Sequence, residues 1–132
     1  MLVAALALAL LASIVVTSCV SSKPATDLAD PGLPFGPTAV NTSVPVAFVQ
    51  DIKPIFDRDC VECHEGREAR GGYSTSSYAA AMAGQRPGDA RSSVVRDCAP
   101  GGSMYIYFSG DAVAKATLVF RWMVVNDGLQ SR

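Results

Sequence analysis

The segment Cys60-Val61-Glu62-Cys63-His64 constrains this 132-residue chain more than any other feature. Two cysteines separated by two residues and followed directly by a histidine have the spacing at which haem is attached covalently to a protein. Both thiols can then reach the vinyl groups of one macrocycle and form thioethers, and the adjacent imidazole becomes the proximal iron ligand. We therefore expect one haem c, attached through Cys60 and Cys63, with His64 bound to its iron.

Two other interpretations of the same five residues stay open. A CxxC pair can form a disulfide or a thiol couple beside an unrelated histidine. A structural zinc site takes four Cys or His ligands. Because His64 is the only histidine of the chain, Cys98 would be the remaining plausible zinc ligand. Haem is favoured over both, and its second axial ligand cannot be another histidine of this chain.

The N-terminus predicts export and lipid anchoring. Residues 2–16 form an uncharged apolar run, which is short for a membrane span but matches the apolar core of a signal peptide. The run ends in Val16-Thr17-Ser18-Cys19, which looks like a bacterial lipobox whose cysteine is lipidated. We predict a lipoprotein signal peptide over residues 1–18 and a lipid on Cys19, with an ordinary signal peptide as the alternative. Val20 after the cysteine mildly favours the outer membrane.

Residues 19–45 predict a tether rich in Pro, Ser and Thr, followed by a domain over residues 46–132. Four prolines before Pro45 prevent a helix or sheet from continuing through the tether. A flexible chain of this length has a root-mean-square reach of roughly 25–30 Å. The formal net charge of −1 gives no electrostatic case for nucleic-acid binding.

The domain is predicted to be all-α, with three or four short helices wrapped around one haem. Apolar residues follow a helical period over residues 48–56, and a helix that opens at Asp51 or Ile52 is expected to lead into Cys60. The clearest helix lies between an N-cap at Asp111 and a C-cap at Gly128. Trp122 is expected to anchor the packing of this last helix. Two shorter helices are predicted over 78–82, capped by Ser74 or Thr75, and over 104–108, capped by Ser103, with a loop over 84–102.

The run AFVQDIKPIFDRDCVECHEG, residues 47–66, resembles the opening of the small c-type cytochrome domains called planctomycete-type. Those domains begin with an aromatic residue and an Asp-Ile-x-Pro-Ile/Leu helix that leads into CxxCH. GGYSTSSYAAAMAG and RWMVVNDG look like the middle and the final helix, so the resemblance covers about residues 47–128. It implies a haem c domain that transfers electrons, and the residues carried over are Cys60, Cys63 and His64.

The family usually has a Met-Pro loop before its last helix, and the methionine of that loop is the distal iron ligand. No Met-Pro occurs in this chain. We expect Met104 to be the distal ligand because it lies nearest to where that loop would fall. Met82 is the alternative, and an open or partner-supplied position is another. Met123 lies within the last helix and is expected to pack against the first helix.

These features predict a membrane-tethered monohaem cytochrome that passes single electrons between redox proteins or within a respiratory or photosynthetic complex. A gas or peroxide sensor with an open iron position is the alternative, as is a mainly structural subunit. An enzyme is not expected, since the single histidine is committed to iron and no phosphate-binding glycine loop followed by Lys is present. Export places the chain at the periplasm or cell surface, and the leftover Cys98 is expected to be buried.

Overall fold

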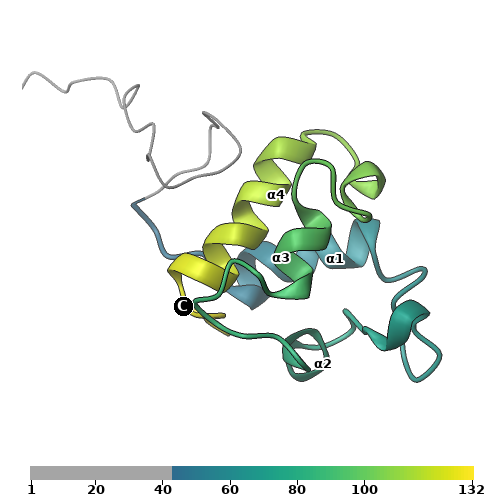
Figure 1. The fold of residues 1–132 in the computed structure, drawn as a ribbon. Helices are drawn as coiled ribbons and strands as arrows, with labels where there is room; N and C mark the ends of the chain where they lie inside the picture. Colours follow the sequence, from purple (N-terminus) through teal and green to yellow (C-terminus); the bar gives the residue numbers. More distant parts are fainter. Residues whose placement is uncertain (1–42) are drawn as a thin grey trace, which may run out of the picture.

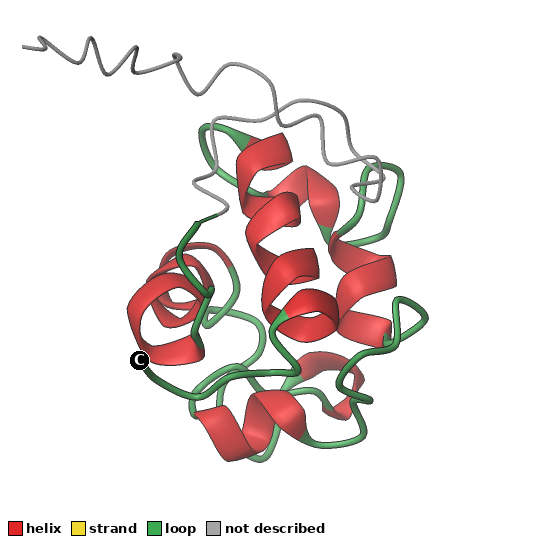
Figure 2. Ribbon diagram, turned by 90° about the vertical axis from the view of Figure 1, so that its left-hand side faces the viewer, coloured by secondary structure: helices red, strands yellow, loops and turns green. Residues whose placement is uncertain are grey.

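The structure, a computed structural model, describes residues 43–132. The predicted signal peptide, Cys19 and most of the predicted tether lie outside these residues. The described part contains helices and no strand, which confirms the all-α prediction (Figures 1 and 2). None of the helices in residues 43–132 is both long and apolar enough to span a membrane.

Two long helical stretches and several short turns of helix make up this part of the chain. In chain order they are η1 (Phe48–Ile52), α1 (Lys53–Asp59), η2 (Arg70–Gly72), α2 (Tyr78–Met82), α3 (Ser93–Cys98), η3 (Tyr105–Tyr107), α4 (Ala112–Phe120) and η4 (Arg121–Val125). η1 and η4 are π-helical turns that continue into or out of α1 and α4, and η2 and η3 are 3₁₀ turns. α3 packs beside α4 (Figure 1).

The first helical stretch begins at Phe48, before the predicted start at Asp51 or Ile52. Its first turn is wide, because the N–H of Lys53 donates to the carbonyl oxygen of Phe48. Pro54 explains this geometry, since it has no N–H to donate and its ring would clash with the carbonyl four residues earlier in a regular α-helix. The π turn thus lets one helical stretch pass through a proline.

The last helix has the predicted cap at its start. The Asp111 carboxylate accepts a hydrogen bond of 2.9 Å from the N–H of Ala114. The helical stretch ends at Val125, and Gly128, with a φ of 68°, donates its N–H to the carbonyl of Trp122 at 2.8 Å. A left-handed residue after the end of a helix is the usual role of glycine.

The short helices differ from the predictions at their caps. α2 has the predicted bounds, but its cap is Ser77, whose hydroxyl accepts from the N–H of Ala80 at 3.2 Å. The segment after Ser103 forms only the 3₁₀ turn η3. The residue before this turn is Met104, and no side chain caps the turn. The predicted caps Ser74, Thr75 and Ser103 were therefore wrong.

α3 was not predicted, because residues 84–102 were expected to be a loop. The helix is held at its start by a long side chain from outside it: the Gln85 amide oxygen accepts from the N–H of Val94 at 3.1 Å. The Ser92 hydroxyl also donates to the carbonyl of Arg86 at 2.7 Å. Because the cap comes from a residue nine positions away, the sequence around the start of α3 does not indicate a helix. A helix of six residues is also too short to show a clear apolar period.

Trp122 is the anchor of the core, as expected. It is fully buried, and its ring centroid lies 5.6 Å from that of Phe48 and 6.2 Å from that of Phe56. The Tyr78 ring contacts Phe48 from the other side, at 5.5 Å. The indole N–H of Trp122 donates to the carbonyl of Leu129 at 3.1 Å, so the one polar atom of this side chain is also satisfied.

The C-terminal tail joins the two ends of the domain. The N–H groups of Phe48 and Val49 donate to the carbonyls of Leu129 and Gln130 at 2.8 and 2.9 Å. Arg132 forms an ion pair with Asp51. The start of the domain, where the tether would arrive, is therefore fixed against its last residues.

A partly buried ion pair between Asp59 and Lys115 connects α1 to α4. The Asp59 side chain is 2% exposed and that of Lys115 is 16% exposed. Burial alone would raise the pKa of Asp59, but hydrogen bonds from Lys115 and Ser109 and the Lys115 charge outweigh it and lower this pKa below its usual value. The pair stabilises the fold next to Cys60.

Replacing Lys115 with Met should lower the free energy of unfolding by about 3 kcal/mol at neutral pH, because Asp59 would lose its buried partner. In the wild type the contribution of Asp59 is present above the unfolded pKa of 3.8 and is lost as the pH falls through the lower folded pKa. In the variant burial raises the folded pKa of Asp59, so acidification should instead recover stability. Urea unfolding at several pH values measures both effects.

Lys53→Met is the matched control, since the Lys53–Asp57 pair is solvent-exposed, with side-chain exposures of 32% and 47%. Its loss should cost no more than about 0.5 kcal/mol. Equal effects of the two substitutions would contradict a structural role for the Asp59 pair.

Candidate cofactor-binding site

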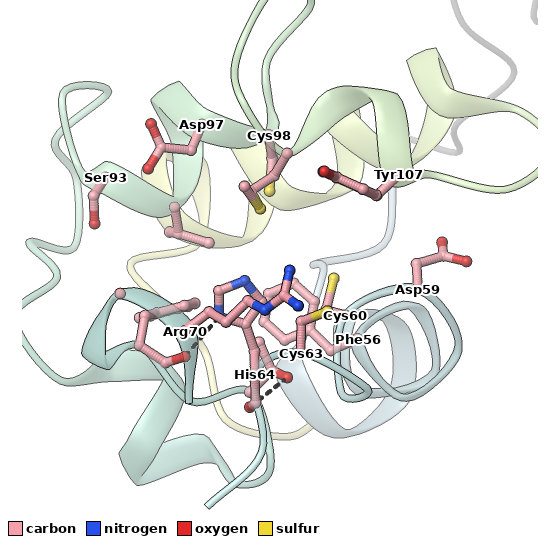
Figure 3. Close-up of a pocket in the computed structure, with 15 residues that line it drawn as sticks. Phe56, Asp59, Cys60, Cys63, His64, Arg70, Ser93, Asp97, Cys98 and Tyr107 are labelled. Carbon is pink, nitrogen blue, oxygen red and sulfur yellow. Dashed lines mark hydrogen bonds between the residues drawn. The ribbon is translucent and has the colours of Figure 1, made fainter. Parts of the chain in front are cut away.

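A cavity of about 380 Å³ lies between the CxxCH segment and α3 (Figure 3). Cofactor sites typically have volumes of about 300–1,000 Å³ and are lined mostly by apolar groups with a few polar atoms. The residues that line the cavity come from α1 and the segment after it, from α3, and from the loop around η3. They are Phe56, Asp59, Cys60, Cys63, His64, Arg70, Gly71, Tyr73, Thr75, Ser93, Val94, Asp97, Cys98, Met104 and Tyr107.

The predicted haem residues lie together because the chain turns tightly after α1. The N–H of Cys60, the C-cap of α1, makes the last regular bond of this helix, to the carbonyl of Phe56 at 2.9 Å. The N–H groups of Cys63 and His64 then return to the carbonyl of Cys60, at 3.1 and 3.0 Å. Cys60, Cys63 and His64 consequently line the same cavity (Figure 3).

The His64 ring is oriented by a hydrogen bond from its Nδ1 to the carbonyl oxygen of Tyr73, at 2.8 Å. A carbonyl oxygen only accepts, so Nδ1 carries the hydrogen, and in the neutral ring Nε2 has the lone pair. Histidines that bind metals usually donate their other ring nitrogen to such an acceptor. The ring lines the cavity, and Nε2 is its available donor atom.

The segment that presents the Tyr73 carbonyl is itself fixed. The Tyr73 hydroxyl donates to the carbonyl of Ala81 at 2.9 Å, and burial is the main cause that raises the pKa of this tyrosine. Thr75 is 2% exposed, and its N–H donates to the carbonyl of His64 at 2.8 Å. Thr75, predicted as a helix cap, instead holds the backbone of the histidine.

The opposite wall of the cavity carries Val94, Cys98 and Met104. Cys98 is 5% exposed, which confirms the expected burial, and it is a free thiol like Cys60 and Cys63. Burial raises the pKa of the Cys98 thiol. Burial and then the charge of Asp59 raise the pKa of Cys60 to about 11. Without a partner, these two thiols are protonated at neutral pH.

The methionines separate into two groups. Met104, the predicted distal ligand, lines the cavity. Met82, the alternative, is not among the lining residues, and its side chain packs against Gly128. Met123 is fully buried in the hydrophobic core, in agreement with its expected packing role.

The two aspartates that line the cavity have ion-pair partners, and the cavity also has a cation, Arg70. Asp59 is paired with Lys115, and Asp97 lies next to Arg96 at 3.4 Å. Arg70 lines the cavity from an exposed position and points its guanidinium toward the space in front of His64 (Figure 3). This exposed cation can meet an acidic group of a ligand at the mouth.

Gly102 makes it possible for Met104 to lie near the end of α3. A Cβ on Gly102 would be 2.4 Å from the carbonyl oxygens of Arg96 and Asp97, so only glycine fits there. The N–H of Met104 donates to the carbonyl of Asp97 at 2.8 Å. The loop is therefore folded back against α3, with Met104 on the same wall as Cys98.

Gly102→Ala should lower the free energy of unfolding by about 1–3 kcal/mol, because the added methyl group must displace the backbone of α3 or of its own loop. Chemical unfolding measures the loss. Ser103→Ala, at the exposed neighbouring position, is the control and should be close to neutral. Equal stability of the two variants would show that the close approach at Gly102 is not required.

In residues 43–132 no group of three or more His, Cys, Asp and Glu side chains could hold a metal ion. The zinc interpretation of the motif therefore gains no support from the geometry. Comparison with protein-family models, curated proteins and solved structures finds no match. The resemblance to small c-type cytochromes rests on the sequence motifs alone.

Proposed function

We propose that this protein is a membrane-tethered monohaem c-type cytochrome that carries single electrons between redox partners. The observation that carries the proposal is the His64 ring, with Nδ1 bonded to the Tyr73 carbonyl and Nε2 free in a cavity that Cys60 and Cys63 also line. This donor set fits haem c, which needs two thiols for its vinyl groups and one imidazole for its iron.

Bound haem would supply a one-electron change at its iron, and residues of this chain would hold the haem in position. Cys60 and Cys63 would hold the macrocycle through thioethers, and His64 Nε2 would bind the iron. The Tyr73 carbonyl would keep the imidazole in the required tautomer. Phe56 and Val94 would give the cavity apolar surface, and Arg70 would be available to pair with the acidic groups of the haem.

The sulfur-bearing wall opposite His64 favours a carrier over a sensor with an open iron position. Met104 is the proposed distal ligand from the sequence, and it lines this wall, whereas Met82 does not. A thioether as the second axial ligand raises the reduction potential of haem. A carrier needs no substrate, and we propose no enzymatic activity.

The proposed setting follows from the sequence outside the described residues. Lipid on Cys19 would anchor the exported protein to a bacterial membrane, with the outer membrane favoured, and residues 19–45 would let the haem domain reach its partners. The partners would be other redox proteins or a respiratory or photosynthetic complex. Nucleic acid is not proposed as a partner.

Covalent attachment is tested in cells that express a haem c maturation system. The wild type should keep its haem on a denaturing gel, because thioether bonds survive unfolding. Replacing Cys60 and Cys63 together with Ala should abolish the haem stain. Cys98→Ala is the control and should keep it. Haem that is extracted from the wild type by acidified acetone would contradict the proposal.

Lipid anchoring is tested with Cys19→Ser, which removes the residue that would carry the acyl chains. Two or more acyl chains are needed for stable membrane attachment. The variant should either appear in the soluble fraction or stay in the membrane as the unprocessed precursor. Fractionation and mass spectrometry of the N-terminal peptide measure this. A mature wild-type protein with an unmodified thiol at Cys19 would rule out the anchor.

A further inference from the structure

Cys98 is a second sulfur on the wall that faces His64. It is the last residue of α3, it lines the cavity, and it lies across that cavity from the imidazole (Figure 3). Its side chain belongs to the hydrophobic core cluster, yet it borders the space in which a cofactor would lie. Neither the CxxCH motif nor the resemblance to the cytochrome domains assigns a role to this residue.

Cys98 is 5% exposed, and its thiol is free of any disulfide among the described residues. This degree of burial leaves no access for a disulfide to another protein. The charged or ionisable groups that act on it are Cys60, Asp97 and Tyr73. Among the residues that line the cavity, the cation is Arg70, at an exposed position.

We propose that Cys98 is an axial ligand of the oxidised haem iron, bound as a thiolate on the side opposite His64. This assignment rests on the proposed function, since it needs haem to be present. On coordination to iron that is already ferric, a sulfur–iron bond would replace the S–H bond of Cys98 and the bond from iron to the Met104 thioether, and the proton would leave to solvent through the cavity mouth. No electron is transferred in this step, so no oxidant is required.

The sulfurs of Cys98 and Met104 favour different oxidation states of the haem iron. A thiolate is anionic and donates electron density, which stabilises ferric iron, whereas the neutral thioether of methionine favours ferrous iron and raises the potential. Met104 lies on the same wall as Cys98 and is tied to the end of α3 through its bond to Asp97. Cys98 thus serves the oxidised form, and Met104 remains the ligand of the reduced form.

The test uses the full haem-loaded protein and begins with the unmodified wild type. The oxidised protein should give a low-spin electron paramagnetic resonance spectrum and a near-infrared charge-transfer band of the His/thiolate type. Cys98→Ala should lose both features and should show a higher reduction potential. A wild type whose ferric spectra are of the His/Met type or high-spin would overturn the assignment, whether or not the variant folds.

Met104→Leu is the matched control, because it removes the neighbouring sulfur and keeps a side chain of similar volume. It should leave the ferric spectra unchanged and should alter the spectrum of the reduced protein. Ferric spectra that are identical in the wild type and Cys98→Ala would refute the role of Cys98. In that case haem that survives denaturation would still support the proposed function, whereas haem that is lost on denaturation would overturn both.

Discussion

The hydrogen bond from His64 Nδ1 to the Tyr73 carbonyl fixes where the only imidazole of the chain offers its second nitrogen. It works because both partners are held by the backbone. The turn after α1 holds His64 through Cys60, and Thr75 holds the histidine carbonyl at 2.8 Å. If that bond were absent, the ring could rotate or exchange tautomers, and the cavity would lose its oriented donor.

The molecule separates a packed aromatic core from a cavity, and Phe56 belongs to both. Phe56 is 1% exposed, and its ring centroid lies 6.2 Å from that of Trp122. The same side chain also lines the cavity. The C-terminal tail closes the core on one side, while the Asp59–Lys115 pair ties α1 to α4 next to Cys60. The short helices around the cavity depend on tertiary contacts, which is expected for segments too short to be stable as isolated helices.

The parts of the structure that the sequence predicted are those that local chemistry determines. The cap at Asp111 and the grouping of Cys60, Cys63 and His64 each depend on residues close together in the chain, and Trp122 was predicted from its large apolar side chain. α3 was missed because its start is capped by Gln85, and Tyr73 was missed because it acts through a main-chain carbonyl, which no side-chain pattern records. The nearness of Cys98 to the motif is a long-range contact, and the only sequence signal for it was a cysteine left without a role.

We propose that one haem is attached to this protein through the two cysteines of the motif. Trypsin should release the peptide Asp59–Arg67, which contains both cysteines and His64. Mass spectrometry of the exported protein should find this peptide with the mass of one haem on its two sulfurs. The same peptide with two free thiols or with an internal disulfide would exclude covalent haem.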